Sequence, residues 1–203
     1  MKKKNVLVMA LSLVLVAVIS VGATMAYFTD QTETAVNVFT SGKVDIELVD
    51  KSPEGVDLIC GEETENGIEY ERVQPGDKLS KTVGVNVAAG SENAWTALKL
   101  TFSATPAQGS ALTEEQAIAA VKALIAVDAD KWEVADDIYY CKSALAAESG
   151  ATLFKTIEIP AEWDNNYGGI SFTIGVEAAA VQEANLTYEA AKAELKEMLT
   201  PEA

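Results

Sequence analysis

The chain has 203 residues and a formal charge of −16, from 15 basic and 31 acidic side chains, and it contains no histidine. The missing imidazole excludes catalytic triads and zinc sites that depend on histidine. The negative charge argues against nucleic-acid binding through a basic surface. With 49% hydrophobic residues, the chain is too apolar for a purely disordered protein, and its length suits one domain.

The N-terminus has the three-part order of a secretory signal peptide. Three lysines at positions 2–4 precede an apolar run over 6–21, and small residues continue to Ala26. We predict cleavage between Ala26 and Tyr27, so that residues 1–26 are the leader; a retained membrane anchor is the alternative. The leader carries three lysines and no acidic residue, so its removal changes the formal charge from −16 to −19. We therefore expect a secreted, acidic product that meets a membrane only through an uncleaved leader.

Apolar and polar residues alternate along several segments that follow the leader, which is the pattern of strands with one buried face. Turn-forming residues separate these segments. Pro75, Gly76 and Asp77 fit a tight turn, and residues 89–93 fit a hairpin loop. The pattern favours antiparallel sheets packed as a sandwich. The strong segments are 43–48, 82–87, 97–102, 153–159 and 170–177, and the weaker ones are 68–73 and 137–141.

Two stretches have helical spacing instead. Thr113 and Gln116 form a capping box before an apolar stripe, which predicts an inserted helix. Thr187 is the expected N-cap of a C-terminal helix that runs to Leu199. We expect both apolar stripes to pack on the core, and residues 27–203 to form a single, mostly β domain.

The residues at the leader junction, 26–30, and the first strand, 38–48, resemble those of the TasA/camelysin family of exported bacterial proteins. Residues 73–79 are similar to the family's Pro-Gly-Asp turn, and 169–182 to its closing strand. The resemblance covers the leader and about half of the remaining chain. It implies an antiparallel, jelly-roll-like β-sandwich and leader removal by a specialised signal peptidase. It also implies a subunit of biofilm-matrix fibres.

In that family, the freed N-terminal segment of one subunit is thought to complete a sheet of its neighbour. The resemblance therefore makes residues 27–39 a candidate donor strand, carried by Tyr27, Phe28, Val36, Val38 and Phe39. An unpaired sheet edge would offer such a strand a row of hydrogen-bonding groups. A frayed terminus, or an edge strand within the same molecule, is the alternative interpretation of this segment.

Catalysis and metal binding have little support in the sequence. Camelysin is classed as a metalloprotease, but such enzymes use histidine ligands that this chain lacks. Asp128 and Asp130 begin like a calcium loop, yet Trp132 and Glu133 stand where a ligand and the glycine belong. Trp163 and Tyr167 suggest sugar stacking, although anchoring of their loop is the simpler interpretation. We expect no catalytic residues, no metal and no cofactor.

Cys60 and Cys141 are the only cysteines, and export permits a disulfide between them; two free, buried thiols are the alternative. The leading hypothesis is a secreted structural subunit whose main partner is itself, in a homopolymer. A signal peptidase and an accessory matrix protein are the further candidate partners. The alternatives are a monomeric cell-surface adhesin or binding domain, and, as the least supported, a camelysin-like protease.

Overall fold

The computed structural model describes residues 38–41, 44–64, 67–70 and 73–200, all within the compact unit Thr34–Ala203. The predicted cleavage site and the donor residues Tyr27, Phe28 and Val36 lie outside the described residues. Within the described part of the chain, no helix is long and apolar enough to cross a membrane.

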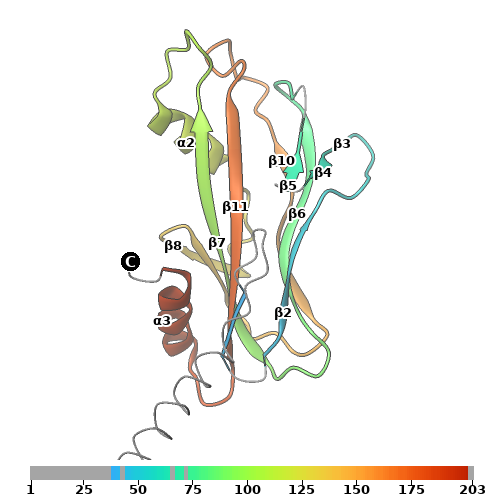
Figure 1. Cartoon of the computed structure of the whole chain (residues 1–203), viewed down its shortest axis with the longest axis vertical. Coiled ribbons are helices and arrows are strands. Elements are labelled where there is room, and N and C mark those ends of the chain that lie inside the picture. Colours follow the sequence, from blue (N-terminus) through green and yellow to red (C-terminus); the bar gives the residue numbers. More distant parts are fainter. Residues whose placement is uncertain (1–37, 42–43, 65–66, 71–72, 201–203) are drawn as a thin grey trace, which may run out of the picture. The chain divides into compact units, whose positions relative to one another are not determined.

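The described residues are mostly β, with two helices, as the sequence predicts (Figure 1). The helices are α2 (Glu114–Ala123) and α3 (Tyr188–Leu199). The strands are β1 (Val38–Ser41), β2 (Ile46–Lys51), β3 (Ile59–Cys60), β4 (Glu62–Thr64), β5 (Gly67–Glu69), β6 (Lys78–Val87), β7 (Ala94–Thr105), β8 (Trp132–Ala135), β9 (Ile138–Cys141), β10 (Gly150–Glu158) and β11 (Ser171–Gln182).

Two main sheets form separate layers (Figure 1). One has the order β1-β11-β7-β9-β8, and the other has the order β10-β6-β2, with β3 also paired to β6. Most ladders are antiparallel, as expected, but β1 pairs with β11 and β3 pairs with β6 in parallel. A separate small sheet joins β4 to β5.

The alternating residues of both sheets meet in one shared core. Its members from β6 are odd-numbered, such as Val83 and Val85, while those from β11 are even-numbered, such as Val176 and Ala178. Because side chains alternate across a strand, the other parity of β11 faces outward. There Ala179 and Val181 pack with α3 in a second cluster.

Both helices begin where the sequence predicts. Thr113 and Gln116 form the reciprocal capping box of α2, and the Thr187 hydroxyl accepts a hydrogen bond from the Ala190 amide at the start of α3. The prediction that both apolar stripes pack on the protein is confirmed. The buried stripe residues are Val121 and Leu124 in the first stretch and Ala191, Leu195 and Leu199 in the second.

The turn between β8 and β9 connects both helices to the sheet. Asp136 and Asp137 have φ angles of 55° and 62°, as expected for a two-residue hairpin turn. The Asp136 carboxylate lies 2.7 Å from the Lys196 ammonium of α3, and that of Asp137 lies 2.5 Å from the Lys122 ammonium of α2.

One turn prediction is wrong. Residues 89–93 do not close a hairpin, because the strands that they join, β6 and β7, lie in different sheets. Turn-forming residues indicate where the chain reverses, but they do not reveal whether the flanking strands pair with each other. The sequence analysis also missed β3, β4 and β8, which are two to four residues long.

A candidate strand-docking groove

The β11 strand has a free edge over its first half. Its other edge is fully paired, since β7 accompanies it from Ser171 to Gln182. On the free side, β1 pairs only with Ala178–Val181. Within the described part of the chain, no strand pairs with residues 171–177 on that side. Seven residues of extended backbone, about 20 Å of strand, therefore have no strand partner on this side among the described residues.

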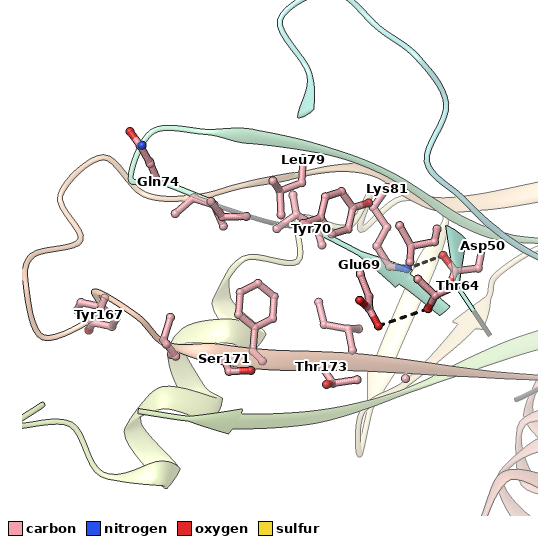
Figure 2. Close-up of a pocket in the computed structure, with 18 of the residues that line it drawn as sticks. Asp50, Thr64, Glu69, Tyr70, Gln74, Leu79, Lys81, Tyr167, Ser171 and Thr173 are labelled. Atoms are coloured by element: carbon pink, nitrogen blue, oxygen red, sulfur yellow. Dashed lines mark hydrogen bonds and ion pairs between the residues drawn. The ribbon is translucent and has the colours of Figure 1, made fainter. Parts of the chain in front are cut away.

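A groove of about 1020 Å³ runs beside this free edge. It is lined on one side by residues 171–176 of β11, and on the other by β2, β6 and the segment around β5 (Figure 2). Its apolar lining continues the shared core of the two sheets. The apolar lining residues include Leu48, Tyr70, Val73, Leu79, Phe172 and Ile174.

The core is incompletely covered at this groove. Leu48, Tyr70, Phe172 and Ile174 pack against the buried core, yet each remains only half-buried. Burial of apolar surface contributes about 25 cal/mol per Å² of area removed from water. An added strand along β11 would therefore gain both backbone hydrogen bonds and apolar contacts.

A lysine occupies a core-facing position of β6 and lines the groove. Lys81 stands between Leu79 and Val83 on the parity that otherwise builds the core. Its ammonium lies 2.5 Å from the Asp50 carboxylate of β2 (Figure 2). Its side chain is 8% exposed and that of Asp50 is 29% exposed. The pairing is needed, because an unpaired ammonium at this depth would be costly.

Polar contacts also fix the wall around Tyr70. The Tyr70 hydroxyl donates to the Ser80 carbonyl at 2.5 Å, and the Ser80 hydroxyl donates to the Pro53 carbonyl. Burial is the main cause that raises the pKa of Tyr70, so the phenol keeps its proton and remains a donor. These two hydrogen bonds fix Tyr70, which lines the groove, against Ser80 of β6.

Trp163 and Tyr167 stack on each other at one end of the groove, with ring centroids 4.6 Å apart and an interplanar angle of 13°. The loop between them is ordered by Asp164, whose carboxylate accepts a hydrogen bond from the Asn166 amide. The mutual stacking fits the interpretation that these rings anchor their loop.

The other predicted site residues that the structure describes lie on different elements and form no common site. Val38 and Phe39 belong to β1, which pairs with β11 of its own chain. Cys60 is exposed on β3 and Cys141 is buried on β9; both are free thiols, and no disulfide joins them. The Asp128 carboxylate accepts from the Asp130 amide and lies 3.2 Å from the Lys131 ammonium. Among the described residues, no cluster of three metal-ligating side chains occurs.

Two features of the groove escaped the sequence analysis. One is the free edge of β11, which depends on where neighbouring strands end. The other is Lys81, for which a signal existed: it is the one charged residue on the parity of Leu79, Val83, Val85 and Val87. Comparison with known proteins finds no matching family model, no matching curated protein and no matching solved structure.

Proposed function

We propose that this protein is a secreted structural subunit that assembles into extracellular fibres, each copy donating its N-terminal segment to the groove of another copy. The observation that carries the proposal is the free edge of β11 beside an incompletely covered apolar groove. Strand addition satisfies such an edge with main-chain hydrogen bonds, and alternate side chains fill the adjoining groove. The proposed role is structural and assigns no catalytic step to the chain.

Residues 27–37 form a segment long enough to act as the donor. Eleven extended residues reach about 36 Å, which exceeds the roughly 20 Å of free edge. The donor can therefore cover the edge and still leave a few residues to connect two copies. In this proposal, leader removal releases the segment for docking.

The jelly-roll arrangement is part of the same proposal. Its support is the alternation of the chain between the two main sheets after β6: β7 to β9 lie in one sheet, β10 in the other, and β11 again in the first. Donor insertion beside β11 would extend the five-stranded sheet along its edge.

The direct test compares residues 27–203 with residues 38–203, which keep all of β1 and lack the donor. We expect fibres from the first protein under electron microscopy and a folded monomer from the second. Because the truncated copy still has a groove, it should accept a donor but offer none. Added in small amounts, it should cap and shorten growing fibres. Fibres formed by the truncated protein alone would contradict the proposal.

A monomeric binding domain is the second candidate, favoured by the partly exposed Trp163 and Tyr167 at the groove. It would use the same free edge to capture a foreign extended peptide. The two functions separate in sedimentation at high concentration, where a binding domain stays monomeric with its N-terminal segment intact.

A further inference from the structure

The parallel register of β1 on β11 identifies which preceding residues would extend this ladder along the free edge. Val38 pairs with Ala178, Phe39 with Ala179, Thr40 with Ala180 and Ser41 with Val181, in parallel. The offset between partners is thus constant. If the same ladder continued toward the N-terminus, residues 31–37 would lie opposite residues 171–177, the part of the β11 edge that has no partner among the described strands.

We propose that, before assembly, residues 31–37 of the same chain occupy the groove by extending β1 along β11. This inference rests on the proposed function of the groove and adds how its use is controlled. Docking within the molecule requires no loop and no chain reversal, since Asn37 directly precedes Val38. The donor of another copy competes for the same edge and must displace it.

The alternation of side chains supports this register. Even-numbered residues of β11 face the core, and directly paired residues of a ladder point to the same side of the sheet. Thr32, Thr34 and Val36 would then enter the groove, and all three are β-branched residues that suit strands. The outward set, Gln31, Glu33, Ala35 and Asn37, would lie beside the exposed Ser171 and Thr173. A slip by one residue would bring Glu33 and Asn37 inward.

Self-docking makes the free monomer a closed form. A tethered segment has an effective concentration in the millimolar range, which donors of other copies reach only when they are highly concentrated. Assembly therefore requires release of the segment first. At high protein concentration, we expect the rate of fibre formation to become independent of concentration, because this release within one molecule then limits it.

A labelled peptide of residues 27–37 tests the closed form. We expect it to bind residues 38–203 at least about tenfold more tightly than residues 27–203 in dilute solution, where the cis segment competes. The substitution Val36→Asp in the peptide should abolish binding, because it would place a charge in the groove. The matched substitution Ala35→Asp, on the outward parity, should leave binding nearly unchanged.

The outcomes separate the two claims. Equal affinity for both proteins would overturn the closed form and leave the acceptor groove intact. Binding to neither protein, with both shown to be folded by circular dichroism, would overturn the proposed function as well. Equal loss of binding with Val36→Asp and Ala35→Asp would overturn the register.

A cross-link in the intact monomer avoids the truncation. In residues 27–203 with Cys60→Ser, the pair Glu33→Cys and Thr173→Cys would lie about 5 Å apart on neighbouring strands. Glu33→Cys with Ser103→Cys, one strand further on the same exposed face, would lie about 10 Å apart. We expect a short thiol cross-linker to join the first pair within one molecule and to leave the second unjoined. Equal yields, or none from either pair, would overturn the closed form.

Discussion

The Lys81 ammonium lies 2.5 Å from the Asp50 carboxylate where both residues line the groove. Lys81 is the more deeply buried partner, so losing Asp50 would leave its ammonium with less contact to water than losing Lys81 would leave the Asp50 carboxylate. The pair places charge within an otherwise apolar wall and holds β2 against β6 beyond their last ladder position, Lys51 opposite Thr82.

Breaking this pair should destabilise the fold. Asp50→Asn leaves a buried ammonium without its counter-ion, and we expect a loss of about 2 to 3 kcal/mol in the free energy of unfolding, measured with urea. The double variant Lys81→Met with Asp50→Leu should recover most of the loss. As a control, Lys78→Met on β6 removes an exposed ion pair with Glu158 of β10 and should change little. An equal loss for Lys78→Met would contradict the assignment.

Acid should loosen the attachment of α3. The Lys192 ammonium lowers the pKa of Glu133 below its ordinary 4.5, and the Lys196 ammonium lowers that of Asp136 below its ordinary 3.8. The folded state therefore binds fewer protons than the unfolded state as pH falls through this range. The stability that these pairs contribute is present at neutral pH and is lost as pH falls through the lowered pKa values.

The variant Glu133→Gln with Asp136→Asn removes this pH dependence. We expect it to be less stable than the parent at pH 7 and to differ less from it as the pH falls from about 5 to about 3, in urea midpoints. Glu194→Gln is the matched control. Glu194 is exposed on α3 and belongs to none of the ion pairs found among the described residues. A difference that stays constant with pH would contradict the prediction.

The two thiols should differ in reactivity. Cys60 is exposed, whereas Cys141 is 5% exposed in the core and burial raises its pKa, which keeps it protonated. We expect one thiol per chain to react with maleimide under native conditions and a second to react only in denaturant. The variant Cys60→Ser should abolish the fast reaction. If both thiols reacted slowly, or both reacted quickly, under native conditions, this assignment of one exposed and one buried thiol would be wrong.

Assembly should depend on salt. In the proposed assembly, removal of the predicted leader would leave a formal charge of −19, and copies with this charge would repel each other before their strands exchange. We expect faster fibre formation as salt rises from about 50 mM to 500 mM, and at mildly acidic pH, because both reduce this repulsion. Light scattering provides the rate, and a rate independent of both conditions would contradict this account.

Local patterns predicted the elements better than their arrangement. The capping box at Thr113 and the alternation before Val176 depend on neighbouring residues, so they were visible in the sequence. The parallel pairing of Val38 with Ala178 joins residues far apart in the chain, and no local rule fixes it. The groove depends on where β1 ends on β11, which is a property of the assembled sheet.

Mixed cross-linking tests the central claim most directly. In the exchanged state residues 34–37 connect the two copies and residues 27–33 cover the edge, so one preparation of residues 27–203 carries Thr29→Cys, a second carries Thr173→Cys, and both carry Cys60→Ser. The two are mixed, assembled and treated with a short thiol cross-linker. The account predicts covalent heterodimers that contain one copy of each variant and appear only as fibres form. Fibres that yield no such heterodimers would contradict donor docking on the free edge of β11.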